Sequence, residues 1–291
     1  MLESDNISKC KILNIVTLFC NEIEVLEYAI KLSKQSISAD ISLVIVVNKN
    51  GVMTENDFND KLRKINLKIY LYKPRENLGY LNGLIYGYNQ FIKRHESPEW
   101  IVMSNTDITF SNNEFFKDFF KNKYNENIWL IGPSIYSSKN KSYDNPQYKN
   151  RHSLKSLEKR IYIFKRPMLA YYYLKIANIK AKYKKRKKED SQYTYSLHGC
   201  FFFVNNNFME ILKDKKYGSL MYSEEAYLAE LVRLNNKKCY YESGIEVIHT
   251  ESTVTGKIDV KKKIRYFQES LEYIKKEFYI LEFGDKYAEQ K

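Results

Sequence analysis

Short apolar segments alternate with helix-like segments through the first third of this chain. The apolar segments are rich in β-branched residues and lie at residues 12–19, 41–47, 67–72 and 100–103. Short runs of this kind predict buried strands. Between the first two, Val25, Ala29 and Leu32 recur at helical spacing. Strands that alternate with helices predict an α/β fold, in which helices flank a doubly wound, mostly parallel central sheet.

The second half of the chain has a less regular pattern. Residues 128–131 and 195–204 predict strands, and Ser223 is expected to cap the start of a helix. A basic helix beginning near residue 154 is interrupted by Pro167, and residues 260–278 predict a final charged helix. No flexible linker divides this pattern, so the length of 291 residues suggests one α/β domain with helical additions.

A short polar turn follows the fourth apolar segment. Its sequence is Ser104-Asn105-Thr106-Asp107. An Asn-x-Asp sequence at a strand end places a carboxylate at the carboxyl edge of the sheet, where α/β proteins bind ligands. The alternative is that Asn105 and Asp107 only shape the turn through bonds to the local backbone.

Four further segments follow in an order that fits this turn. They are Asn77-Leu78-Gly79, His198-Gly199-Cys200-Phe201, Tyr222-Ser223-Glu224-Glu225 and His249-x-x-Ser252. Together with Asn105-x-Asp107, they resemble the inverting glycosyltransferases of family 2, of the rhamnosyltransferase and galactofuranosyltransferase kind. The resemblance covers roughly residues 12–252, apart from those between 134 and 193.

The resemblance implies the GT-A (nucleotide-diphospho-sugar transferase) fold and a domain division. The glycosyltransferase domain is expected at 1–255, with a basic aromatic helical insertion at about 150–190. A C-terminal helical extension would follow at 256–291.

The resemblance also implies a donor site for a UDP- or dTDP-linked sugar. The residues that it places there are Thr17, Phe19, Asn21, Asn48, Asn77, Gly79, Asn105 and Asp107. Asn48 stands where the family usually has Asp at the end of the second strand. Asn77-x-Gly79 would pass beneath the diphosphate.

Transfer of a sugar requires stabilisation of the departing diphosphate, which a divalent cation, Mg²⁺ or Mn²⁺, can supply. In the resembled family the last Asp of the acid-rich turn holds the metal, and here that residue is Asp107. Asn105 replaces the first acid, and the resemblance places His249 near the metal. Mg²⁺ needs only one or two carboxylates beside substrate phosphates. The alternative for His249 is a half-buried strand-end histidine bonded to the backbone.

The acceptor hydroxyl needs a general base, which a positioned carboxylate provides. The resemblance places Glu225 in that role beside Glu224, and His198, Gly199 and Cys200 on the acceptor side. The alternative is structural, because acidic residues at a helix start stabilise the helix with no catalysis.

Basic residues are concentrated in one segment. Residues 155–188 contain 13 Lys and Arg, one acid (Glu158) and six Tyr or Phe residues, whereas the whole chain has a net charge of +13. A basic helix with an apolar stripe suits an anionic membrane surface, where a lipid-linked acceptor would be found. Alternatively, it is a solvated helix packed on the domain. A basic patch with tyrosines also suits single-stranded nucleic acid, but no motif for it accompanies the segment, and no nucleic-acid partner is expected.

The composition of the chain indicates where in the cell the protein is expected. Four scattered cysteines lack metal-ligand spacing, the first nine residues are polar, and no apolar run is long enough to span a bilayer. We expect a bacterial protein in the cytoplasm, peripheral on the inner face of the membrane, in capsule, lipopolysaccharide or other surface polysaccharide synthesis.

Two other functions remain open. The first is a non-catalytic membrane- or RNA-binding adaptor on a degenerate GT-A scaffold, for which Asn48 and Asn105 would be signs of decay. The second is a sugar-1-phosphate nucleotidyltransferase, although residues 15–24 lack its Gly-rich signature.

Overall fold

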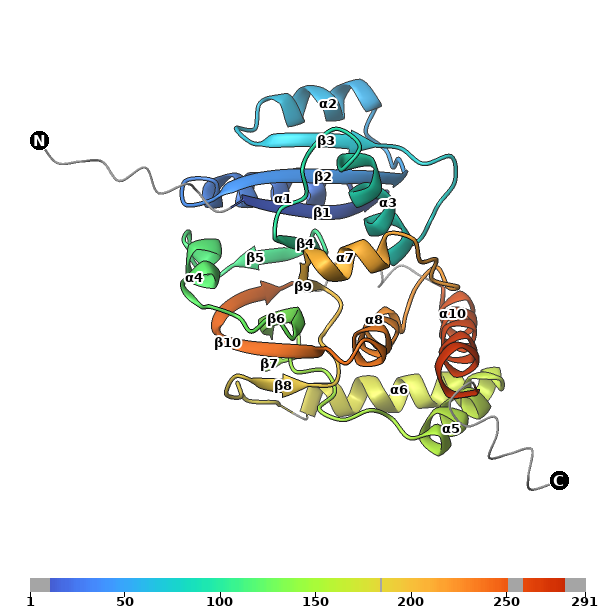
Figure 1. The fold of residues 1–291 in the computed structure, drawn as a ribbon. Helices are drawn as coiled ribbons and strands as arrows, with labels where there is room; N and C mark the ends of the chain where they lie inside the picture. Colours follow the sequence, from blue (N-terminus) through green and yellow to red (C-terminus); the bar gives the residue numbers. More distant parts are fainter. Residues whose placement is uncertain (1–10, 184, 251–258, 281–291) are drawn as a thin grey trace, which may run out of the picture.

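A single sheet runs through the middle of the molecule, with helices on both of its faces (Figure 1). The computed structural model describes residues 11–183, 185–250 and 259–280. Within these residues the sheet has ten strands, and its main order is β3-β2-β1-β4-β9-β6-β10-β5. Strand β7 pairs with β6, and β8 pairs with β10.

The first half of the sheet is parallel. It consists of β1 (Lys11–Phe19), β2 (Asp40–Lys49), β3 (Lys68–Tyr72) and β4 (Trp100–Ser104). The connecting helices are α1 (Glu22–Gln35), α2 (Glu55–Arg63) and α3 (Leu81–Phe91). The doubly wound prediction is confirmed here. Helix α2 was not predicted, since it buries only Phe58 and Leu62 and so has a weak apolar period.

The second half of the sheet mixes directions. Its strands are β5 (Ile108–Phe110), β6 (Ile128–Ser137), β7 (Ser142–Tyr143), β8 (Gln192–Thr194), β9 (Phe201–Asn205) and β10 (Lys238–His249). Strand β9 is antiparallel to both β4 and β6, whereas β6 and β10 are parallel. The strand predicted at 195–204 is wrong in its first half, because the chain between β8 and β9 turns so that the His198 N–H meets the Asn145 side chain.

Two apolar clusters fill the space on either side of the sheet, as expected when parallel strands are covered on both faces. One lies beneath α3 and contains Leu84 and Tyr88. The other lies beneath α1 and α4 (Phe115–Lys121) and is rich in phenylalanine. There the rings of Phe119 and Phe203 stack with centroids 3.7 Å apart.

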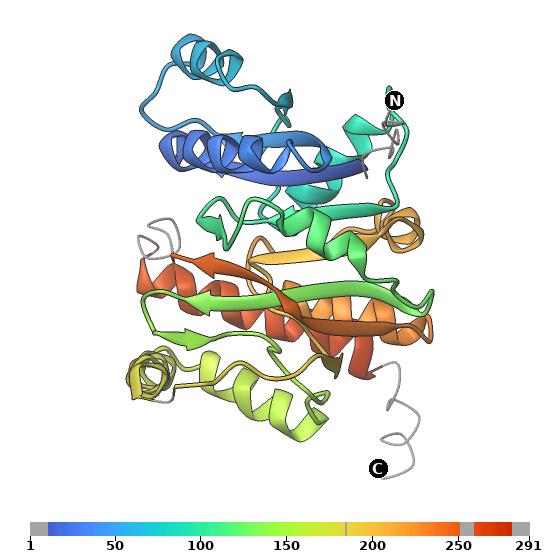
Figure 2. The ribbon, with the colours of Figure 1, turned by 90° about the vertical axis from the view of Figure 1, so that its left-hand side faces the viewer.

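The remaining helices gather beside the β10 half of the sheet (Figures 1 and 2). They are α5 (Leu154–Phe164), α6 (Pro167–Tyr183), α7 (Asn206–Leu212), α8 (Glu224–Leu234), α10 (Val260–Ile274) and the π-helical turn η1 (Lys275–Ile280). The predicted interruption of the basic helix is confirmed, because α5 ends at Phe164 and Pro167 opens α6, a position that proline tolerates. Helix α10 adds Ile264, Leu271 and Ile274 to the cluster that also holds Tyr227 of α8.

Candidate active site

The topology brings the predicted site segments to one edge of the sheet. Strands β1, β2 and β4 are parallel, so their carboxyl ends share that edge. Strand β9 is antiparallel to β4, with Phe201 opposite Ser104, so the residues just before β9 lie beside the acid turn. Strands β6 and β10 run in the direction of β4, which brings the end of β10, His249, to the same place. This carboxyl edge is where α/β folds bind ligands.

Asp107 and His249 contact each other at this edge. Asp107 Oδ2 lies 3.1 Å from His249 Nε2, and both side chains are buried. The pairing of β5 with β10 sets His249 opposite Ile108, and the Thr250 N–H donates to the Asp107 carbonyl at 3.0 Å. The backbone register therefore fixes the pair. Burial opposes the protonation of His249, but the charge of Cys200 and the bond to Asp107 outweigh it and raise its pKa.

His198 and Cys200 lie next to this pair. The His198 and His249 rings have centroids 5.7 Å apart, and the Cys200 N–H donates to His198 Nδ1 at 3.3 Å. The Cys200 carbonyl accepts from the Asn105 N–H at 2.8 Å. Burial alone would raise the pKa of the Cys200 thiol, but the two histidines lower it overall. The predicted acceptor strand and the predicted acid turn are thus adjacent.

The side chains at this edge offer few ligands for a divalent cation. His249 Nδ1 is buried and finds no hydrogen-bond partner among the described residues. Within residues 11–183, 185–250 and 259–280, however, no cluster of three or more His, Cys, Asp or Glu side chains is arranged to hold a metal. Asp107 and His249 supply two donors, which suits an ion that takes its other ligands from phosphate and water. Ser252 of the predicted His-x-x-Ser segment lies outside the described residues.

Four of the predicted donor-site residues form a polar cradle at the ends of β1, β2 and β3. The Asn48 side chain donates to the Gly79 carbonyl at 2.9 Å and accepts from the Leu78 N–H at 3.1 Å. Asn77 accepts from the Gly79 N–H at 3.0 Å. Gly79 has a φ of +75° and packs on the backbone of Leu220, so a side chain there would be strained and would clash.

Thr17 completes this cradle across a glycine of α3. A Cβ added at Gly83 would lie 2.9 Å from Thr17 Cγ2 and 3.2 Å from Asn48 Nδ2. The missing side chain therefore lets α3 approach the ends of β1 and β2 closely. Asn48 is used here to hold the Asn77–Gly79 loop. This structural role needs one donor and one acceptor, which an amide supplies and an ionised carboxylate does not.

Phe19 and Asn21 connect the end of β1 to the acid turn. Asn21 Nδ2 donates to Thr106 Oγ1 at 2.9 Å, and Asn21 Oδ1 accepts from the Phe19 N–H at 2.8 Å. Asn21 occupies the N-cap position of α1 but makes no side-chain cap bond, because its Oδ1 accepts from the Phe19 N–H and not from an N–H of the helix. The bond to Thr106 fixes the turn that carries Asp107 against the first strand.

The turn before α8 departs from an ordinary helix start. Tyr222 and Ser223 have φ values of 70° and 61°, a left-handed conformation that side chains rarely adopt. Ser223 makes no cap bond, contrary to the sequence prediction, and its hydroxyl instead bonds Ser270 of α10 at 3.0 Å. Strained backbone of this kind concentrates at functional sites.

Glu224 and Glu225 follow this turn and have different surroundings. Glu224 is buried, and the backbone of Tyr222 and of Glu224 itself lies close enough to its carboxyl group to oppose part of the rise in its pKa. Burial and the charge of Glu225 raise the pKa of Glu224 to about 8. Glu225 is half-buried and lies against Gly199, where an added Cβ would be 2.9 Å from Glu225 Oε1. The structure therefore joins the predicted base to the predicted acceptor strand.

Tyr80 is a site residue that the sequence prediction missed. Its hydroxyl donates to the Gly199 carbonyl at 2.8 Å, and its N–H donates to the Leu220 carbonyl at 3.1 Å. Burial raises its pKa well above the usual value, with contributions from Cys200, Glu224, Asp107 and Glu225. Tyr80 thus lies between the donor and acceptor sides. The available signal was its place directly after Gly79, at the start of a helix.

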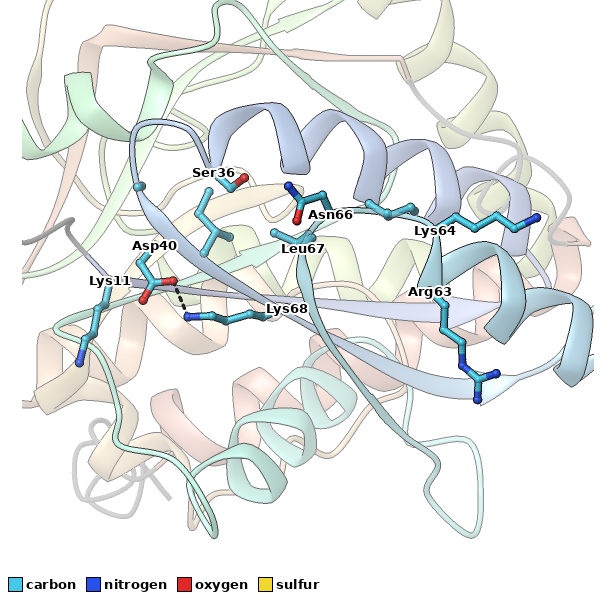
Figure 3. A pocket seen from close by; sticks show the side chains of 11 residues that line it. Lys11, Ser36, Asp40, Arg63, Lys64, Asn66, Leu67 and Lys68 are labelled. Atoms are coloured by element: carbon cyan, nitrogen blue, oxygen red, sulfur yellow. Dashed lines mark hydrogen bonds and ion pairs between the residues drawn. The ribbon is translucent and has the colours of Figure 1, made fainter.

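An open cavity lies at the opposite edge of the sheet. It measures about 860 Å³ and is lined by the first residues of β1, β2 and β3, namely Lys11, Asp40 and Lys68 (Figure 3). Lys68 pairs with Asp40 at 2.8 Å. None of the predicted site residues lines it. Ligands of open α/β sheets bind at the carboxyl ends of strands, so the acid and histidine edge is the candidate site.

Comparison with known proteins identifies the fold. No protein-family model and no curated protein sequence matches the chain. Among solved structures, the mannosyltransferase PcManGT from Pyrobaculum calidifontis, in complex with GDP-Man and Mn²⁺, aligns with a TM-score of 0.54 and 12% identity. That alignment covers 84% of this chain and 58% of that one.

Two further structures give similar agreement. GalNAc-T7 with UDP, GalNAc and Mn²⁺ has a TM-score of 0.53 and 10% identity, over 93% of this chain and 50% of that one. S. aureus TarS in complex with UDP-GlcNAc has a TM-score of 0.53 and 13% identity, over 94% and 73%. This chain thus spans about half to three quarters of the length of these glycosyltransferases, and it has their GT-A fold.

Proposed function

We propose that this protein is an inverting glycosyltransferase that moves a sugar, of the hexose type, from a nucleotide diphosphate to a hydroxyl group. One observation carries the proposal. The Asp107–His249 pair and the Glu225–Gly199 contact lie at the carboxyl edge of a GT-A sheet, with Tyr80 between them. The site therefore has a donor side with an acid and a histidine, and an acceptor side with a carboxylate of its own.

The donor would lie along the ends of the first strands. Thr17 and Asn48 would contact the nucleoside, and Asn77-x-Gly79 would pass beneath the diphosphate, where Gly79 would let the diphosphate approach the backbone. Neighbouring structures hold GDP-Man, UDP and UDP-GlcNAc, which supports a nucleotide sugar as the ligand class. UDP- and dTDP-linked sugars, with rhamnosyl and galactosyl donors first, are the ones to test.

Asp107 and His249 are the residues that would hold a divalent cation, Mg²⁺ or Mn²⁺. Such an ion, when bound beside a diphosphate, stabilises the negative charge of the leaving group. Two of the neighbouring structures contain Mn²⁺. The other requirement, removal of the proton from the acceptor hydroxyl, would be met by a side chain of the protein.

Glu225 would act as the general base. Its carboxylate would take the proton of the acceptor hydroxyl as the oxygen attacks the anomeric carbon, on the face opposite the departing diphosphate, which inverts the configuration. Glu224 is buried close to the backbone of its own turn, so we assign it to the support of Glu225. The Tyr80 hydroxyl would hold the Gly199 carbonyl and so the acceptor strand.

The acceptor is proposed to be a glycan, and a lipid-linked one, in capsule, lipopolysaccharide or other surface polysaccharide synthesis. The support is the sequence resemblance and the basic aromatic segment at 155–188. A peripheral position on the cytoplasmic face of the membrane follows from such an acceptor. Among the described residues, no helix is long and apolar enough to cross a membrane.

The direct test is sugar transfer and nucleotide-sugar hydrolysis, measured with and without Mn²⁺ over a panel of UDP, dTDP and GDP sugars. Glu225→Gln should reduce transfer by about 10²–10⁴-fold with donor affinity unchanged, because the amide keeps the size of the side chain but cannot accept the proton. The same change at Glu224 should cost less. A Glu225→Gln enzyme that transfers sugar near the parental rate would refute the assignment.

A non-catalytic adaptor on the same scaffold is the second candidate. The observation in its favour is the small donor set, in which Asn105 replaces an acid and the described residues offer only the Asp107–His249 pair. An adaptor would show no turnover with any donor of the panel, and its nucleotide affinity would not respond to metal.

A further inference from the structure

Helix α6 presents most of its apolar side chains to solvent. Of its 17 residues only Ala170 is buried, and residues 175–183 are exposed along their whole length. The first half of the helix packs on α5 through Ala170 and Leu174. An exposed contiguous apolar surface on a water-facing helix is a mark of an interaction site.

Five of the exposed apolar residues of α6 form one stripe. Met168, Tyr172, Ile176, Ile179 and Tyr183 are spaced four, four, three and four residues apart, which places them along one side of the helix. Their exposed fractions lie between 53% and 83%. Ala170 and Leu174 face the body, so the stripe lies on the opposite, solvent-exposed side of α6.

Lysines flank this stripe. At 100° per residue, Lys175 and Lys182 lie on one flank of it and Lys180 lies on the other. We propose that this face of α6 binds the surface of an anionic lipid bilayer, with the stripe in the interface and the lysines on the headgroups. Long lysine side chains can reach headgroups while the stripe is immersed.

Residues 184–188, which follow α6 within the basic segment 155–188, are all Lys or Arg. The Arg186 guanidinium donates to backbone carbonyls after β6, at Asp144 and Pro146. Lys188 pairs with Glu246 of β10 at 3.1 Å. These two cations are therefore held on the domain, and Lys184 lies outside the described residues. We therefore assign membrane attachment to α6 itself and not to residues 184–188.

Charge and shape favour a lipid surface over two other occupants. A second copy of the chain would set one basic α6 face against another, because residues 155–188 carry 13 Lys and Arg and one acid. Single-stranded nucleic acid binds through positive charge and stacked aromatics, yet Met168, Ile176 and Ile179 offer neither. An anionic bilayer uses both the aliphatic stripe and the lysines.

An aromatic chain connects this surface to the acceptor side of the site. Tyr173 of α6 contacts Phe164 of α5 with centroids 5.7 Å apart, and Phe164 contacts Phe267 of α10 at 5.0 Å. Phe267 stacks on Tyr222 at 3.9 Å. Tyr222 belongs to the turn that presents Glu224 and Glu225. A bilayer bound at α6 would hold a lipid-linked acceptor at a fixed place relative to that turn; this last step rests on the proposed transferase activity, whereas bilayer binding does not.

The test is sedimentation of the full chain with vesicles of phosphatidylcholine, with and without phosphatidylglycerol. We expect binding to the anionic vesicles alone, and weaker binding as salt is raised. Ile176→Ser with Ile179→Ser should lower the partition coefficient at least about tenfold. Charge reversal at Lys175, Lys180 and Lys182 should lower it by about fivefold for each residue.

A matched control is available on the opposite part of the molecule. Ile30 and Ile37 are also exposed, at 48% and 77%, and their change to Ser should leave vesicle binding as it is. Equal binding of the two double variants would overturn the proposal. So would a dimer that Ile176→Ser with Ile179→Ser abolishes, or binding to a single-stranded RNA in preference to vesicles. Nucleotide-induced thermal shifts on the same variants separate this result from the proposed function, because they should persist when vesicle binding is lost.

Discussion

Gly199 leaves the room that the Glu225 carboxylate occupies. The residue needs no unusual backbone angle, so its value lies in the absence of a side chain. A Cβ there would come within 2.9 Å of Glu225 Oε1, and the flexible glutamate would move aside. Under the proposed function, a displaced Glu225 would lose its alignment with the acceptor, and the absence of a side chain at Gly199 would then matter for the rate.

We therefore predict that Gly199→Ala slows sugar transfer by about 10- to 100-fold and changes the free energy of unfolding by less than about 1 kcal/mol. Gly244 gives a matched control, because a Cβ there would lie 3.0 Å from Glu242 Oε1, away from the site. Transfer rates and melting temperatures of Gly199→Ala and Gly244→Ala make the comparison. If both variants keep the parental rate, Gly199 is a packing residue only.

Glu224 gives a prediction for the pH dependence of stability. Its pKa is about 8 in the folded protein, against 4.5 for the free side chain, because the group is buried beside Glu225. Below pH 4.5 both states hold the proton. Between 4.5 and 8 the unfolded chain releases it while the folded protein keeps it, so the free energy of unfolding falls as pH rises through this window.

Glu224→Gln removes this proton release. The variant should gain on the order of 1–3 kcal/mol relative to the parent between pH 5 and pH 8.5. Denaturant unfolding of both proteins at the two pH values measures the difference. Parallel stabilities at both pH values would show that Glu224 is ionised in the folded protein throughout.

At the scale of secondary-structure elements, the sequence predicted strands and helices best where apolar residues recur over a long segment. Strands β1, β2, β3 and β4 and helix α1 were predicted, as was the break at Pro167. The split of the 195–204 segment was not, because the bond from His198 to Asn145 joins residues 53 apart. The left-handed turn at Tyr222 and Ser223 was also missed, since neither residue type signals positive φ.

The same limit applies to the site. The resemblance placed His249 near a metal held by Asp107, and the contact that the structure shows between the two side chains depends on the register of β5 with β10. Tyr80 was missed because its partners, Gly199 and Leu220, come from distant parts of the chain. Local sequence indicates which residue types lie at the strand ends. Side chains that connect one strand end to another, such as Tyr80, can be identified only from the tertiary structure.

Helix α10 supports the turn that carries the candidate base, and this gives a prediction at the element scale. Phe267→Leu removes the stack on Tyr222, which is worth about 0.5–1.5 kcal/mol. We expect a small loss of stability and a fall in kcat of about tenfold, with donor affinity unchanged, because the turn lies on the acceptor side. The control is Phe120→Leu, whose ring contacts Phe119 at 5.1 Å, on the α4 side of the sheet. Equal kcat values for the two variants would show that α10 has no part in placing the turn.

On the scale of the whole molecule, the two edges of the sheet and the basic helices carry different groups of side chains. The carboxyl edge gathers the acid, histidine and glutamate side chains, while the amino edge has an open basic cavity around the Asp40–Lys68 pair. The net charge of +13 comes largely from residues 155–188, on the side of α5 and α6. The candidate chemistry and the candidate membrane surface therefore occupy separate parts of one fold, which allows them to be tested apart.

The small donor set at Asp107 and His249 leads to a prediction about cooperative binding. Two protein donors should hold a divalent cation weakly, and a nucleotide diphosphate would add phosphate oxygens to the same ion. Mn²⁺ alone and UDP alone should each raise the melting temperature little, and the pair together much more. A ligand at about 100 times its dissociation constant adds about 2.7 kcal/mol of stability. A chelator should reverse the gain.

Asp107→Asn should abolish this cooperative gain without unfolding the protein, because the amide keeps the size of a residue placed by the backbone bonds of β5 and β10. Asp40→Asn is the matched control, since Asp40 lies in the cavity at the other edge of the sheet. Thermal shifts measured over a grid of Mn²⁺ and nucleotide concentrations decide the outcome. Additive shifts in the parent, or a cooperative shift that survives Asp107→Asn, would remove Asp107 from the metal site and favour the adaptor.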